Sequence, residues 1–250
     1  MPSRPGAVRN GVGVRARRFA RHGRWRTLLH DGPLLTAVVL AGTVAFHLLY
    51  LIPATRHVAA TLLHEDNVVE SITFVGLAAA CVLGGRLAVR LRRDGQPTLI
   101  WVFFALFAIG LFFVAMEEIS WGQWLFFWNT PEGWKEVNRQ GETNLHNLPG
   151  LFGRSEWMRL AFAAGGLVGV LAARRPALKT LATPAALTGF FVVMTAYILG
   201  DLVDDLFDAP WVISTFSTMS EFVEMLIGIA AVAYFVLKRE ELIGPPLPGP

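Results

Sequence analysis

The chain has 250 residues, of which 54% are hydrophobic and only 16% are charged. A water-soluble domain of this length carries about 25% charged residues, so the composition excludes an ordinary soluble domain and indicates a surface that faces lipid. The single cysteine, Cys81, excludes an intrachain disulfide and a cysteine-based zinc cluster.

The N-terminal residues, 1–32, carry much of the positive charge. Eight arginines lie between Arg4 and Arg26, and no acidic residue precedes Asp31. Nucleic-acid-binding arms and transit peptides are also rich in arginine and poor in acids. Because an apolar segment follows directly, we interpret residues 1–32 as a basic cytoplasmic arm of a membrane protein. We therefore expect no nucleic-acid partner.

Six segments are long and apolar enough, or nearly so, to cross the hydrocarbon layer, which takes about 20 residues. In chain order they are 33–53, 68–89, 98–116, 157–173, 180–200 and 214–237. In the fourth, Gly165 and Gly169 form a GxxxG pair, which favours close helix packing. The sequence predicts an all-α integral membrane bundle with about six transmembrane helices, residues 33–237. A proline-rich, disordered cytoplasmic tail over 238–250 would follow.

The distribution of basic residues predicts how the bundle is oriented. With both termini in the cytoplasm, the basic arm, loops 90–97 and 174–179, the tail and Arg86 hold 17 of the 22 Lys and Arg residues. Cytoplasmic loops carry such an excess. Six of the eight tryptophans fall at or beyond the opposite helix ends, where indole rings anchor at the membrane interface. We therefore expect an N-in, C-in topology.

The acidic residues gather on the expected outer side. Fifteen of the 19 Asp and Glu lie there or in the outer parts of helices. Those at helix boundaries are Glu70, Glu117, Glu118, Asp201, Asp204, Asp205, Asp208, Glu221 and Glu224. Carboxylates at membrane depth are costly and usually face the bundle interior or a water-filled cavity. The pattern predicts an outward-facing acidic site. The alternative for Glu117, Glu118, Glu221 and Glu224 is that they are hydrated or pair with Arg154 or Arg159, and for the aspartates at 201–208 that they form an exposed acidic loop.

The outer segment, 117–156, is the largest piece outside the expected helices. Its Thr-Pro-Glu sequence resembles a helix start and predicts a short surface helix near 131–140. Residues 138–147 are dense in side-chain donors and acceptors. If they are helical, Glu142 and His146 lie one turn apart, where both can ligate one metal ion.

Three motifs resemble those of a group of bacterial polytopic membrane proteins whose activity is not known. They are Glu-Glu-x-Ser-Trp-Gly-Gln at 117–123, Thr-Pro-Glu at 130–132, and Asn-x-Gln-x-Glu-x-Asn-Leu-His-Asn at 138–147. The resemblance covers about 30 residues together with the helix count. It implies a location in the bacterial cytoplasmic (inner) membrane and brings no activity with it.

Our leading hypothesis is a metal-assisted hydrolase of a lipid or lipid-linked substrate at the outer leaflet. The expected ligands of a divalent metal ion are Glu118, Glu142, His146, Glu221 and Glu224. The expected catalytic residues are Glu117, Glu118, Ser120 and His146, and the expected substrate-binding residues are Gln123, Asn144, Arg154, Arg159 and Asp201. The ion would acidify a bound water, a spare carboxylate would act as general base, and an arginine would hold an anionic headgroup.

Two other functions are compatible with the same residues. In a proton- or cation-coupled transporter the acids would form a gate or relay, although no acid lies near the inner half of an expected helix. In a non-catalytic membrane component the acidic outer face would bind a partner. Membrane lipids are the partners expected in each case.

Overall fold

The computed structural model describes residues 32–63, 68–138, 141–145, 147–149, 155–207 and 219–244. Its helices are α2 (Gly32–Leu51), α3 (Arg56–Leu62), α4 (Val68–Arg93), α5 (Thr98–Glu118), α6 (Gln123–Phe126), α7 (Glu132–Lys135), α8 (Ser155–Ala172), α9 (Thr188–Phe207) and α11 (Ser220–Ile243). Short 3₁₀ turns lie at Ser120–Gly122, Pro176–Leu178 and Ala185–Leu187. The described residues contain no strand, and the predicted all-α fold class is confirmed.

Five of these helices are long and apolar enough to cross a membrane: α2, α4, α5, α9 with the turn before it, and α11. The remaining long helix, α8, is not among them and carries Glu156 and Arg159 in its first two turns. It nevertheless packs along α9 within the bundle. The predicted number of about six spans is therefore approximate, with five helices that meet the criterion and α8 beside them.

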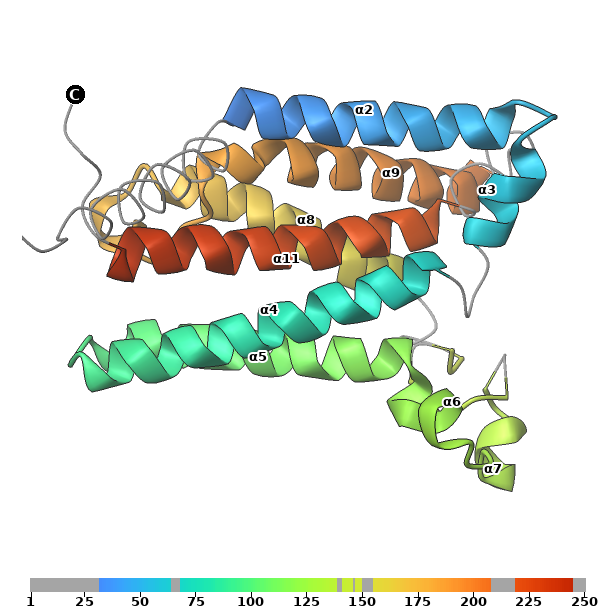
Figure 1. The fold of residues 1–250 in the computed structure, drawn as a ribbon, viewed down its shortest axis with the longest axis horizontal. Helices are drawn as coiled ribbons and strands as arrows, with labels where there is room; N and C mark the ends of the chain where they lie inside the picture. Colours follow the sequence, from blue (N-terminus) through green and yellow to red (C-terminus); the bar gives the residue numbers. More distant parts are fainter. Residues whose placement is uncertain are drawn as a thin grey trace, which may run out of the picture.

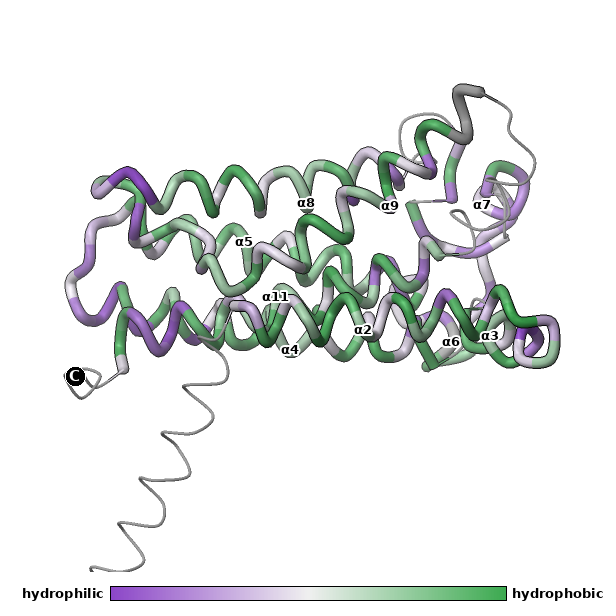
Figure 2. The backbone as a smooth tube through the Cα atoms, turned by 90° about the horizontal axis from the view of Figure 1, so that it is seen from above, coloured by the Kyte–Doolittle hydropathy of each residue, from purple (hydrophilic) through white to green (hydrophobic). Residues whose placement is uncertain are grey.

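The long helices lie roughly side by side, with α4 and α5 forming a hairpin and α4 packing against α11 (Figure 1). On the other side, α9 packs against α2 and α8. Hydrophobic residues run along the helices, while hydrophilic residues concentrate at the two ends of the bundle (Figure 2). Apolar side chains also remain exposed along the helices, for example Val75 at 62% and Leu106 at 63%. A surface of this kind suits contact with lipid.

The two ends of the bundle differ in charge. We call the end that carries α3, α6 and α7 the acidic end, and the end where α2 begins and α11 finishes the basic end (Figure 1). The basic end holds the last turn of α4, with Arg92 and Arg93, and the turn that follows α8, with Arg174 and Arg175. Because α5 and α9 run toward the acidic end and α4, α8 and α11 start there, the boundary acids of five helices meet at one level.

Small residues set the closest approaches between helices. A Cβ on Gly76 would meet the carbonyl carbon of Gly228 at 3.1 Å, so α4 and α11 touch backbone to backbone. On α8, Gly166 lies against the Phe191 ring and Gly169 against Thr183, whereas Gly165 has open space in front of it. Of the predicted GxxxG pair, therefore, Gly169 packs closely and Gly165 does not.

We expect Gly189→Ala to destabilise the bundle by about 1–3 kcal/mol, the usual range for overpacking. A Cβ on Gly189 of α9 would meet the Thr36 Cα at 2.8 Å, and backbone cannot yield as a flexible side chain does. The matched control is Gly42→Ala on α2, where nothing lies within 4 Å and alanine favours the helix. Thermal unfolding in one detergent measures both variants, and equal melting temperatures would contradict this packing.

The basic end is fastened by side chains from α11. Lys238, only 1% exposed, donates to the backbone oxygen of Lys179 at 3.1 Å and to Glu241 at 2.8 Å. Tyr234 donates to the backbone oxygen of Leu181 at 3.0 Å. These bonds hold the turn between α8 and α9 against α11. They also satisfy a cation that would be costly to bury without partners.

Several helices extend beyond their predicted ends. Helix α5 continues to Glu118, so two acids lie within its last turn, and α9 continues to Phe207. The tail predicted over 238–250 is helical as far as Ile243, because residues 238–243 are good helix formers and Lys238 pairs with Glu241 one turn on. The tail from 245 onward and the arm over 1–31 lie outside the described residues.

Candidate functional site

Arg159 is the centre of the acidic end. It lies in the second turn of α8 and is only 7% exposed. Its guanidinium nitrogens lie 3.6 Å from Glu156 of the same helix, 3.5 Å from Asp201 of α9 and 3.6 Å from Glu224 of α11. One buried arginine therefore ties three helices together. Of the acids for which pairing with Arg159 was the predicted alternative, Glu224 makes this pair.

Further carboxylates surround this arginine. Glu118, at the end of α5, lies close enough to Glu70, Glu221, Glu224 and Arg159 for their charges to act on it. We call Arg159 and the six acids Glu70, Glu118, Glu156, Asp201, Glu221 and Glu224 the carboxylate–arginine cluster. Five helices contribute to it, and it contains six acidic side chains for one basic side chain. Burying this many carboxylates is costly unless each is paired, protonated or hydrated.

The ion pairs inside the cluster are loose. Their N···O distances of 3.5–3.6 Å exceed those of direct charge-assisted hydrogen bonds, which are about 2.7–2.9 Å. The Nε atom of Arg159 is buried and has no hydrogen-bond partner among the described residues. Among the described residues, Arg159 therefore has unused hydrogen-bonding capacity at its Nε–H.

The outer segment forms a second polar group, separate from the cluster. Ser120 donates to Glu142 at 2.5 Å, and Asn144 donates to both Ser120 and Glu142 at 3.0 Å. Asn138 in turn donates to the Asn144 side chain at 2.9 Å and accepts from the Glu142 amide at 3.2 Å. Ser120, Asn138 and Asn144 are all buried. These contacts bind the loop after α7 to the end of α5.

Two of the predicted site residues reinforce the same connection. Glu117 accepts from the indole of Trp121 at 2.6 Å and from the backbone amide of Leu145 at 2.5 Å. Gln123 donates to Thr130 at 2.7 Å and accepts from the amide of Thr143 at 3.0 Å. Residues of the motif at 117–123 therefore contact residues of the motif at 138–147. These contacts fix the conformation of the outer segment.

The backbone between α5 and α6 is strained to make these contacts. Ser120 and Trp121 adopt left-handed conformations with φ of 45° and 57°, which non-glycine residues rarely take. The next residue, Gly122, has φ of 87°. This reversal turns Ser120 toward Glu142. The surface helix predicted near 131–140 is shorter than expected and ends at Lys135. Beyond it, the Asn138 side chain donates a hydrogen bond to the loop at Asn144, which competes with a continued helix.

We expect Asn144→Ala to loosen the outer segment while leaving the bundle intact. The change removes the donor that bridges Ser120 and Glu142 and the acceptor used by Asn138, and leaving buried polar groups unpaired costs about 1–3 kcal/mol. Hydrogen exchange over residues 120–145 should rise, and exchange in α4 and α11 should not. Asn129→Ala, at an exposed position of the same segment, is the control. Unchanged exchange in Asn144→Ala would contradict the bracing role.

The predicted metal ligands are distributed over the two groups. Glu118, Glu221 and Glu224 belong to the carboxylate–arginine cluster, whereas Glu142 is bonded to Ser120 and Asn144. Within the ranges that the structure describes, no group of three or more His, Cys, Asp or Glu is arranged to hold a metal ion. His146 lies outside those ranges. The metal hypothesis therefore stays a prediction that depends on His146.

Other predicted residues are also outside the description. Arg154 and Asp208 are not described, nor are the side chains of Asp204 and Asp205. Arg159 and Asp201 face each other, and their predicted role in binding substrate stays a prediction. Glu156 was not predicted at all, although its spacing of three residues from Arg159 is the signal of a helical ion pair.

No family model matches the chain, and the comparisons with curated proteins and solved structures also gave no match. The function must therefore be argued from the geometry of this site.

Proposed function

We propose that the protein is a membrane-embedded hydrolase that acts on a lipid or lipid-linked substrate, with the carboxylate–arginine cluster as its chemical centre. The observation that carries this proposal is the gathering of six acids around one buried arginine at a single end of an apolar bundle. Ionisable groups at this depth are costly and usually serve a function.

Neighbouring carboxylates supply the two groups that hydrolysis needs. An ionised carboxylate takes a proton from water as the water oxygen attacks the substrate, and a protonated carboxyl gives its proton to the leaving group. Glu118 and Glu224 are our candidates because they are neighbours and come from different helices. Arg159 keeps Glu224 and Asp201 in position. If a divalent ion takes part, it would need His146 as a ligand, because Glu118, Glu221 and Glu224 are not arranged to hold a metal on their own, and it would activate the water.

The setting of the site favours a substrate that arrives from the membrane. The cluster lies at the end of helices that expose apolar side chains along their length. We propose further that this end faces outward in the cytoplasmic membrane of a bacterium, with both termini inside. The arginines at the opposite end support this orientation through the positive-inside rule.

A cation- or proton-coupled transporter is the second candidate, because the excess of acids in the cluster also suits cation binding. Against it, the buried side chains of α11 between Glu224 and Lys238 are apolar apart from Tyr234. The described residues of this helix therefore offer no chain of carboxylates toward the basic end.

The test is to reconstitute the purified protein in liposomes that contain a mixture of natural lipids and lipid-linked sugars. Mass spectrometry of the lipids and of the released water-soluble products detects hydrolysis. A pH- or cation-sensitive dye inside the same vesicles detects flux. Product formation without flux supports the hydrolase, whereas flux without products replaces it with the transporter.

A metal requirement is tested on the same preparation. Metal content is measured for the parent protein and for Glu118→Ala and His146→Ala made in the same way. Near-stoichiometric metal in the parent that is lost in both variants supports the metal-assisted form of the proposal. Hydrolysis that persists after chelation, with no metal in any of the three proteins, leaves the carboxylates as the only catalysts.

A further inference from the structure

Four consecutive apolar residues, 125–128, are exposed beside the acidic end of the bundle. Phe126 is 79% exposed and Phe127 is 88% exposed, the two highest values among the large hydrophobic side chains that the structure describes. Single exposed apolar residues are common on protein surfaces, but a contiguous group marks a contact with a membrane or another protein. We call residues 125–128 the apolar loop.

The apolar loop is held in one shape by hydrogen bonds at its base. Gln123 donates to Thr130 at 2.7 Å, a bond that joins the residues on either side of the loop. Gln123 also accepts from the backbone amide of Thr143 at 3.0 Å, which ties this base to the rest of the outer segment. Thr130 is buried. The four apolar side chains are therefore presented together by a braced turn.

The loop adjoins the lipid-facing surface of α5. The Trp121 ring packs edge-on against Phe113 of α5, with the ring centroids 5.9 Å apart. Phe113 is itself exposed, on a helix that is long and apolar enough to cross a membrane. In Figure 1, α6 and α7 lie beyond the end of α5 and are displaced to the side of the α4–α5 hairpin that faces away from the other helices. The outer segment therefore projects past the bundle, toward the place that lipid would occupy.

A lipid surface is the partner whose chemistry suits this loop. Residues 124–129 carry no charge, so no ionised side chain of the loop has to leave water. Aromatic side chains favour the membrane interface, and apolar side chains of surface-bound segments enter the boundary of the acyl chains. Helix α5 has no charged residue before Glu117. Its lipid-facing surface therefore ends close to the point where the outer segment begins.

We infer that the apolar loop inserts into the membrane leaflet at the acidic end, held in shape by the bond between Gln123 and Thr130. Phe126 and Phe127 lie among the lipid chains, and α7 with its charged residues stays on the aqueous side. The loop then anchors the outer segment to the membrane beside the end of α5. This inference goes beyond the proposed function and does not depend on it, because hydrolysis is not measured in its test.

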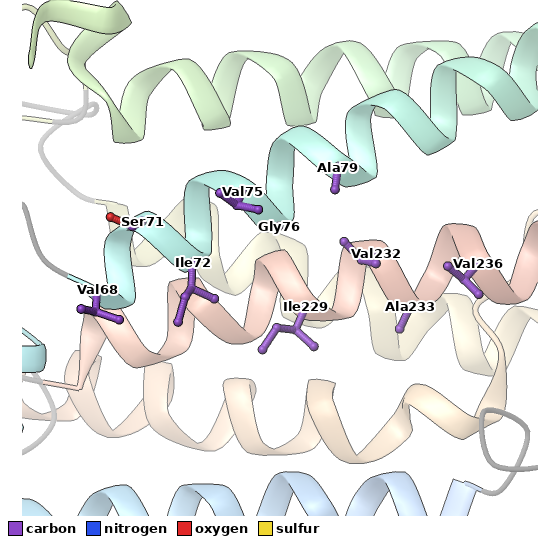
Figure 3. Close-up of a pocket in the computed structure, with 10 residues that line it drawn as sticks. All are labelled: Val68, Ser71, Ile72, Val75, Gly76, Ala79, Ile229, Val232, Ala233 and Val236. Carbon is purple, nitrogen blue, oxygen red and sulfur yellow. The ribbon is translucent and has the colours of Figure 1, made fainter. Parts of the chain in front are cut away.

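The test places one environment-sensitive nitrobenzoxadiazole label at a time in a Cys81→Ala background, in which no other cysteine remains. Phe127→Cys carries the label in the loop and leaves the other three apolar residues in place. Val75→Cys is the reference for lipid, because Val75 is exposed on a spanning helix and lines the groove between α4 and α11 (Figure 3). Glu132→Cys, on the exposed surface of α7, is the reference for water. The labelled proteins are placed in bilayer nanodiscs, both faces of which are open to water.

Two measurements distinguish lipid from water and from protein. Lipids with a nitroxide on the acyl chain quench a label that lies among them, and dithionite bleaches a label that water reaches. At position 127 we expect nitroxide quenching comparable to position 75, and bleaching at least fivefold slower than at position 132. Bleaching as fast as at position 132 overturns the inference. Slow bleaching without nitroxide quenching would mean that a protein, such as a second copy of this chain, covers the loop, and it also overturns the inference.

Thr130→Val in the labelled Phe127→Cys protein tests the brace. Valine has nearly the shape of threonine but cannot accept the hydrogen bond from Gln123. We expect bleaching at position 127 to become at least twofold faster. The matched control is Thr61→Val on α3, where the hydroxyl bonds only within its own helix, and it should leave bleaching unchanged. Equal bleaching in the two valine variants would contradict the role of the brace in holding the loop in the membrane.

Discussion

Arg159→Met is expected to destabilise the protein by about 3–5 kcal/mol, the cost of removing one partner from a buried ion pair. The substitution keeps an unbranched side chain of similar length but removes the charge that faces Glu156, Asp201 and Glu224. Proteins are stable by only about 5–15 kcal/mol in total. We therefore expect a large drop in melting temperature and a poor yield of monodisperse protein.

The cause can be separated from simple loss of packing by restoring the charge balance. Adding Glu224→Gln and Asp201→Asn to Arg159→Met removes two of the carboxylates that lose their contact with the arginine, and should recover part of the lost melting temperature. Arg93→Met is the control, because Arg93 is exposed at the end of α4 and its loss should cost about 0.5 kcal/mol or less. An Arg159→Met protein that melts with the parent would mean that the cluster does not hold the helices together.

The fold could be predicted from the sequence because the bilayer imposes length and hydropathy on each spanning segment. Apolar runs such as 98–116 are sufficient to locate a helix, and the basic loops between them are equally visible. The helix ends could not be predicted as well. Glu117 and Glu118, for example, continue α5 although they are charged. Charge ends an apolar run in the sequence, but it does not end a helix.

Of the three partners of Arg159, only Glu224 could be predicted, and only as an alternative. Which helices meet depends on how each one is rotated about its axis. A helix such as α5, which is apolar on all sides, gives no sign of its buried face. Only Glu156 is near Arg159 in the chain, whereas Asp201 and Glu224 come from helices far along the sequence. The acids could be assigned to one level of the bundle, but not to their contacts.

The conformation of the outer segment could not be predicted for a different reason. The spacing of Glu142 and His146 suggested one turn of a helix, yet residues 141–145 are not helical. The left-handed backbone at Ser120 and Trp121 brings the loop back onto α5, and the dense polar side chains bond to one another. Sequence patterns indicate periodic structure well, but they do not indicate which non-glycine residues accept a strained conformation.

Glu118→Gln is expected to reduce lipid hydrolysis by about 10²–10⁴-fold, the usual contribution of a general acid or base. Glutamine has the shape of glutamate but cannot exchange the proton. The fold should survive, because the change removes one negative charge from a cluster with six acids and one arginine. We therefore expect the melting temperature to stay the same or rise while the rate falls.

A functional carboxylate differs from a structural one because its substitution lowers the rate without lowering the melting temperature. A residue that only supports the fold would lose both together, as we expect for Arg159. The control for the rate is Glu132→Gln on α7, whose side chain is 85% exposed and pairs with Lys135 at the surface; it should hydrolyse at the parent rate. If Glu118→Gln is folded and equally active, Glu118 is not an acid–base group. The same comparison is then made for Glu224→Gln, the second candidate. Glu224 differs from Glu118 in that it also contacts Arg159 directly.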